Sequence, residues 1–93
     1  MIPKDEIKGL EMLYKAVLGL DSEADCENLF TDLCTIAELK SMSQRIQVAK
    51  MLSQGIVYSK IAAQTGASTA TISRVNRCLM YGAGGYKAVV DKI

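Results

Sequence analysis

The sequence contains no histidine and no tryptophan, and it has only one proline and one phenylalanine. Without histidine, the side chain that most often acts as a general base is missing, so neither a Ser-His-Asp triad nor a Cys-His pair can form. Acidic residues cluster at positions 21–27, but their spacing lacks the glycine and the ligand order of a calcium loop. The glycines at 82–85 are not followed by the Lys-Ser/Thr of a phosphate-binding loop. We therefore expect no enzyme, no metal site and no cofactor.

Cysteine is scarce as well, with Cys26, Cys34 and Cys78 as the three examples. An odd number of cysteines without short metal-type spacing indicates reduced thiols in a cytoplasmic protein. The acidic start, MIPKDE, is unlike a secretory signal, and no apolar run approaches the roughly 18 residues that span a bilayer. The sequence predicts a soluble, cytoplasmic protein that makes no contact with membranes.

Charge is distributed unevenly along the chain. Residues 1–38 contain nine acidic residues and three lysines, a net charge of −6, whereas residues 39–93 contain eight cationic residues and one acidic residue, a net charge of +7. No acidic residue lies between Leu39 and Val90. A polyanion such as DNA would be attracted to the second part and repelled by the first. The alternative is that the two charged faces neutralise each other within a dimer.

Apolar residues recur at steps of three or four along most of the chain, which predicts a single all-α domain over residues 1–93. Ser22 can cap one helix, and Thr35 with Glu38 forms a capping box at the start of another. Half of the residues are apolar, but a chain of 93 residues buries only a limited surface, so we expect the core to be completed by homodimerisation. The expected helices cover about residues 4–18, 22–33, 35–55, the two helices of 58–77 and a short segment at 86–90.

The stretch from Tyr58 to Arg77, YSKIAAQTGASTATISRVNR, has the pattern of a helix-turn-helix. Gly66 supplies the positive φ that the turn needs, and Ala62 is small enough for two helices to cross closely. The second helix would begin at Ser68, whose hydroxyl can cap the backbone amide three residues later. The alternative is an αα-hairpin that serves protein association, in an adaptor or structural dimer. Apolar residues expected to hold the two helices together are Ile61, Ile72 and Val75.

Small, hydroxyl-bearing and cationic side chains lie outside this packed seam and suit a major groove. We assign Lys60 and Arg77 to phosphates, and we expect Arg74 to read a base edge together with the small and hydroxyl-bearing residues. The complete set expected to contact double-stranded DNA is Lys60, Ser68, Thr69, Ala70, Ser73, Arg74 and Arg77.

Three blocks of sequence resemble the Trp repressor superfamily, and in particular its YerC/YecD branch. They are the Thr35-capped helix with Arg45 in SMSQRIQVAKMLSQG, the hairpin YSKIAAQTGASTATISR, and the run ATISR at 70–74. The similarity extends from Leu33 to Val90. It implies a six-helix, intertwined homodimer that presents two helix-turn-helix heads to successive major grooves of a palindromic operator, as a transcriptional repressor.

The resemblance also implies a possible effector pocket. In tryptophan-sensing members the corepressor indole lies between two arginines, which match Arg45 and Arg74, and a threonine that matches Thr35 helps to hold the ligand. Val75 stands where those members have glycine, so its branched side chain would narrow the pocket. Cys78 replaces a serine that helps to receive the ligand, and a thiol is a weaker hydrogen-bonding partner than a hydroxyl. We therefore expect no strong binding of L-tryptophan, although Thr35, Arg45, Arg74 and Cys78 could hold another small-molecule corepressor. The alternative role of the two arginines is phosphate contact or pairing between subunits.

Overall fold

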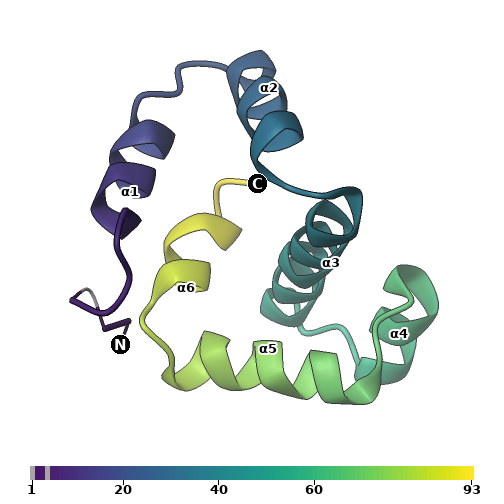
Figure 1. Cartoon of the computed structure of the whole chain (residues 1–93). Helices are drawn as coiled ribbons and strands as arrows, with labels where there is room; N and C mark the ends of the chain where they lie inside the picture. Colours follow the sequence, from purple (N-terminus) through teal and green to yellow (C-terminus); the bar gives the residue numbers. More distant parts are fainter. Residues whose placement is uncertain (1, 4) are drawn as a thin grey trace. The chain divides into compact units, whose positions relative to one another are not determined.

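The computed structural model describes residues 2–3 and 5–93, and within them it contains six helices and no strand (Figure 1). By backbone contacts the chain forms two compact units, Met1–Ile36 and Ala37–Ile93. The predicted all-α class and the number of helices are confirmed. The helices are α1 (Leu10–Leu18), α2 (Glu23–Leu33), α3 (Ile36–Ser53), α4 (Tyr58–Thr65), α5 (Thr69–Tyr81) and α6 (Gly85–Val90).

The first unit contains α1 and α2. α1 begins at Leu10, later than the predicted start near Lys4, which itself lies outside the described residues. Gly9 precedes α1 with φ +81°, a left-handed conformation that interrupts an α-helix. α2 begins as predicted, because the Ser22 hydroxyl accepts a hydrogen bond from the backbone amide of Asp25 at 3.0 Å.

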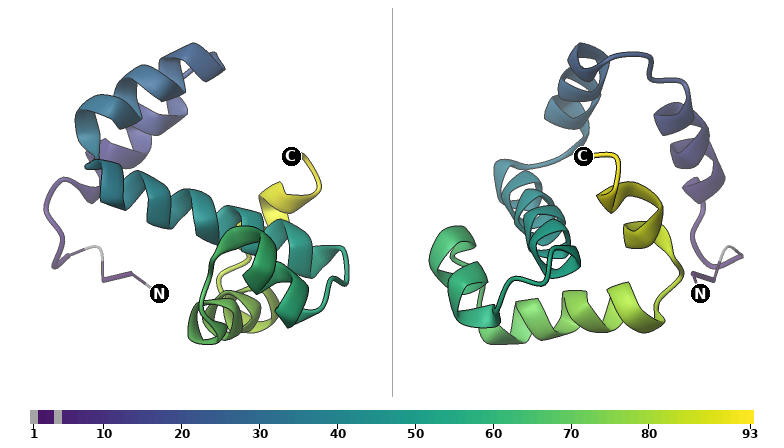
Figure 2. Two further views of the ribbon diagram at one scale, coloured as in Figure 1. Left: turned by 90° about the vertical axis from the view of Figure 1, so that its right-hand side faces the viewer. Right: turned by 180° about the vertical axis from the view of Figure 1, so that it is seen from behind.

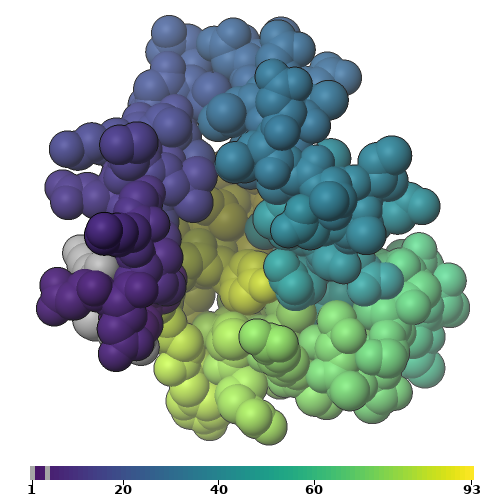
Figure 3. Space-filling model, in the orientation of Figure 1, coloured from purple at the N-terminus to yellow at the C-terminus, as the bar shows by residue number. Residues whose placement is uncertain are grey.

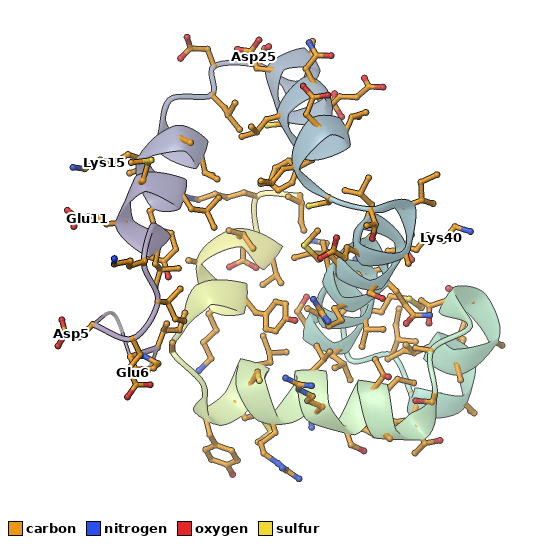
Figure 4. All side chains as sticks on the ribbon, in the orientation of Figure 1. Asp5, Glu6, Glu11, Lys15, Asp25 and Lys40 are labelled. Atoms are coloured by element: carbon orange, nitrogen blue, oxygen red, sulfur yellow. The ribbon has the colours of Figure 1, made fainter. Side chains whose placement is uncertain are left out.

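The surface of this unit is acidic and also rich in apolar side chains. Glu11 and Asp25 project from α1 and α2, and Lys15 forms an exposed ion pair with Glu11 at 3.7 Å (Figure 4). Neither helix has a buried residue. Leu18, at the end of α1, is 83% exposed. α1 and α2 therefore carry more apolar surface than one chain covers.

The second unit encloses the core of the described chain. Residues from α3, α4, α5, α6 and the turn between α4 and α5 contribute to it, and α5 packs against both α4 and α6 (Figures 1 and 2). Because each of these helices contributes to one cluster, α5 is held in a fixed place beside its neighbours. The buried core residues are Val48, Ala49, Ile61, Ala67, Ile72, Val75 and Val90.

Leu39, Met42, Ile46, Ala49 and Leu52 follow helical spacing in the sequence, which predicts that they form the buried face of α3. Ala49 is buried as expected, but Ile46 is 39% exposed, and Val48 is fully buried instead. Ile46 and Val48 are two residues apart, so they point to opposite sides of the helix. α3 carries apolar residues on both sides, and only the packing of α4 and α5 decides which side this chain buries.

A charged contact ties α3 to α6. The Lys50 ammonium donates a hydrogen bond to the backbone carbonyl of Val90, the last residue of α6, at 2.8 Å. A cation at this end of a helix satisfies a carbonyl without an intrahelical partner and complements the helix dipole. Among the described residues, no helix is long and apolar enough to cross a membrane.

Candidate nucleic-acid interface

The turn between α4 and α5 is built from local hydrogen bonds around a glycine. α4 ends at Thr65, and Gly66 adopts φ +74° while its amide donates to the carbonyl of Ala62 at 2.9 Å. The Thr65 hydroxyl donates to the carbonyl of Ile61 at 2.7 Å and accepts from the amide of Ala67 at 3.1 Å. Ala67 is buried, so the turn is anchored in the core immediately after the glycine. The glycine turn predicted from the sequence is confirmed.

α5 begins with the predicted cap. The Ser68 hydroxyl accepts from the amide of Thr71 at 3.1 Å and lies 3.0 Å from the Thr71 hydroxyl, to which it donates. A serine hydroxyl has one proton and two lone pairs, so one lone pair is left for another donor. Ser68 can therefore cap α5 and still accept a hydrogen bond from a base amino group.

The two sides of α5 have opposite character. Ile72 and Val75 are buried in the core, whereas Arg74 and Arg77 are exposed. Thr69 and Ala70 at the start of the helix are exposed as well, and Ser73 is half-buried. Residues 70, 73, 74 and 77 follow helical spacing, so they share one side of α5. In the space-filling view, α4 and α5 form a continuous stretch of surface along the lower edge (Figure 3).

The cations of this surface have no carboxylate partner. Lys60 on α4, and Arg74 and Arg77 on α5, are exposed and form no ion pair with any described residue. The sequence has no acidic residue between Leu39 and Val90. The positive field of these side chains is therefore not neutralised within the second unit, which favours a polyanionic ligand.

The four residues of the possible effector pocket fall in different parts of the chain. Arg45 is half-buried on α3, and Arg74 and Cys78 are exposed one turn apart on α5. Thr35 precedes α3 and belongs to the first unit. The second unit therefore contains three of the four, and the pocket stays a prediction.

Sequence reasoning missed two residues that shape this surface. Gln44 of α3 donates through its side-chain amide to the carbonyl of Thr65 at 3.1 Å, and Ala67 closes the core beneath the turn. The position of Ala67 directly after the turn glycine is a sequence signal for a close packing contact. Gln44 has no such signal, because it lies 21 residues before its partner.

The sequence profile of the family described as Trp repressor protein matches residues 8–93. The chain belongs to this family. It is 47% identical over 91 residues to the uncharacterized protein YerC of Bacillus subtilis, a match that covers 96% of this chain and 88% of YerC. The resemblance stated from sequence is thereby confirmed.

Solved structures of related proteins have the same fold. A TrpR-like protein from Eubacterium eligens superposes with a TM-score of 0.90 at 47% identity, covering 98% of this chain and 94% of that one. A protein from Staphylococcus aureus, described as a candidate Trp repressor, gives a TM-score of 0.88 at 44% identity, covering 99% and 94%. Membership of the Trp repressor family implies a helix-turn-helix DNA-binding regulator, in a family of regulators rather than enzymes.

Proposed function

We propose that this protein is a cytoplasmic transcriptional repressor that binds a palindromic operator as a homodimer. The observation that carries the proposal is the outward side of α5. It presents Arg74 and Arg77 without acidic partners, while Ile72 and Val75 on the opposite side fix the helix to the core. A rigid helix with a cationic outer side is what reading a major groove requires.

Recognition would begin at the start of α5, because the first residues of a recognition helix reach the base edges. Thr69 and Ala70 are exposed there, and Arg74 follows one turn later. An arginine can pair with both acceptors of a guanine in the major groove, worth about 1–3 kcal/mol of discrimination between bases. Lys60 and Arg77 would neutralise phosphates, which orients the protein on the duplex but carries no sequence information.

The first unit supports the dimer. Leu18 and Ile36 are 83% and 73% exposed, and α1 and α2 bury no residue within a single chain. Burial of apolar surface drives association, and a homodimer with twofold symmetry covers the same patch on both copies. Two copies would present two α5 helices, which explains why we expect a palindromic operator.

An effector could act close to the DNA contact. Arg74 belongs both to the base-reading set and to the possible effector pocket with Thr35, Arg45 and Cys78. A small molecule bound there would hold or displace the guanidinium that reads DNA. We therefore propose that any corepressor changes the affinity for DNA through Arg74, and that L-tryptophan is a poor candidate because of Val75.

Selection of bound duplexes from a random pool tests the proposal, followed by titration of the enriched duplex and of a scrambled duplex over a range of salt concentrations. We expect a palindromic consensus and an affinity that falls steeply with salt. Arg74→Ala should weaken binding of the enriched duplex by about 5- to 150-fold and change scrambled-duplex binding much less. Lys60→Ala should weaken both alike and reduce the salt slope by about one.

A second candidate function is a protein-interaction or structural dimer. The observation that favours it is exposed apolar side chains on either side of the hairpin, since Val57 before α4 is 64% exposed and Tyr81 at the end of α5 is 79% exposed. If the selection enriches no sequence and binding to DNA is absent even at low salt, the repressor proposal is wrong and this second candidate remains.

A further inference from the structure

The turn of the helix-turn-helix receives a hydrogen bond from outside the hairpin. Gln44, half-buried on α3, donates from Nε2 to the carbonyl oxygen of Thr65 at 3.1 Å. Thr65 is the last residue of α4, and the final carbonyls of a helix lack intrahelical partners. α3 thus supplies a partner at the point where the chain leaves α4 and turns towards α5.

The contact lies against the most constrained part of the turn. A β-carbon added to Gly66 would be 4.0 Å from Gln44 Nε2, so the amide group borders the glycine as well as the carbonyl before it. The Thr65 hydroxyl joins the turn to Ile61 and Ala67, which are both residues of the hairpin. Gln44, in contrast, connects the turn to a different helix.

α3 holds the hairpin at a second point on the same side. Val48 lies one turn after Gln44 and is fully buried in the core shared with α4 and α5. An apolar contact alone permits sliding and rotation, because it has no preferred direction. A hydrogen bond one turn away requires a defined distance and angle, so the two contacts together fix the hairpin relative to α3.

We propose that Gln44 is a positioning residue for DNA reading, which sets the angle between the α4–α5 hairpin and α3 by holding the carbonyl of Thr65. The inference rests on the proposed function, in which α5 enters the major groove. A small change in this angle would move Arg74 away from the base edges, whereas attraction to phosphates depends much less on orientation.

The decisive variant is Gln44→Glu, which keeps the shape of the side chain but replaces the donor amide by an acceptor-only carboxylate. Gln47→Glu is the matched control, because it makes the same change in charge one turn away on α3. Gln47 is exposed and makes no hydrogen bond to a described residue. We expect Gln44→Glu to bind the duplex enriched by the wild-type protein about tenfold or more weakly than Gln47→Glu does. Binding of a scrambled duplex should fall equally in both variants.

A second measurement needs no DNA. Residual dipolar couplings of the backbone amides report the angle between α3 and the α4–α5 hairpin, and amide exchange reports the protection of Ala67. Gln44→Glu should change that angle and speed exchange at Ala67, while Gln47→Glu should match the wild type. Unchanged couplings in Gln44→Glu, or equal losses of specific binding in both variants, would overturn the inference. If the wild-type protein enriches no DNA sequence, the proposed function fails, and the couplings alone decide whether Gln44 sets the angle.

Discussion

Replacing Gly66 by alanine perturbs the turn of the hairpin without a steric clash. A β-carbon there would meet the Gln44 amide at 4.0 Å, which is an ordinary van der Waals contact. The cost therefore comes from the backbone, because φ +74° is a left-handed conformation that costs an L-residue about 1–2 kcal/mol. Alanine also lowers the conformational entropy of the unfolded chain, which stabilises the folded state by about 0.4–1 kcal/mol and offsets part of this cost. We expect a net loss of stability of about 1 kcal/mol per chain.

Thermal and urea unfolding at a fixed protein concentration measure this loss. A loss of about 1 kcal/mol lowers Tm by about 4–8 °C for a domain of this size. Gly66→Asn should lose less, because asparagine tolerates the left-handed region better than alanine does. Gly55→Ala is the matched control, since Gly55 has φ +76° with open space around its β-carbon position.

Gly66→Ala and Gly55→Ala should differ in their effect on DNA binding. Both should lose similar stability, but only Gly66 lies between α4 and the recognition helix. Binding of a selected duplex under conditions where both variants are folded should therefore weaken in Gly66→Ala alone. An unchanged or raised Tm in Gly66→Ala would refute the assignment of a left-handed backbone at this turn, and equal DNA binding by both variants would refute its role in placing α5.

The remaining predictions concern the end of α5, the dimer and the effector. Gly82→Ala should destabilise the protein more than Gly66→Ala in urea unfolding, because a β-carbon would overlap the backbone carbonyl of Cys78; equal losses would contradict this steric cause. Val17→Asp, on the apolar side of α1, should produce monomers in analytical ultracentrifugation, whereas Ala16→Asp, on another side, should leave the dimer intact. L-tryptophan should leave Tm unchanged, because Val75 stands where tryptophan-sensing members of the family have glycine, and a shift of several degrees would show that it binds.

The beginnings and ends of the helices were largely predictable from the sequence. Ser22 and Ser68 cap α2 and α5 as expected, and Gly66 ends α4 with a positive φ. These signals are readable because a cap acts through neighbours three residues away. α1 is the exception, since it begins only after Gly9, although Ile7 stands at helical spacing from Leu10. Periodicity detects a buried side, but it does not report whether the backbone of one residue is helical.

Side-chain burial was less predictable, because it depends on contacts between distant segments. Ile46 fits the helical spacing of α3 but is 39% exposed, and Leu33 at the end of α2 is 52% exposed. Both fit the sequence rule for core residues, yet a single chain leaves them accessible. Gln44 illustrates the reverse case, since a polar residue in a long helix predicts a solvated side chain. Its partner Thr65 is recognised only once α3 and α4 are packed together.

The boundary between the two units explains why the uneven charge of the chain matters. Met1–Ile36 has a net charge of −5 and Ala37–Ile93 a net charge of +6, so the change of sign falls almost at the boundary between the units. A duplex that approached the first unit would be repelled, whereas the second unit attracts it over a distance of about one Debye length, roughly 10 Å at 0.1 M salt. Charge therefore selects the unit that faces DNA before any base is read. In the proposed function, the precision of base reading then depends on how firmly α5 is held within that unit, and this is the step at which we expect Gln44 and Gly66 to act.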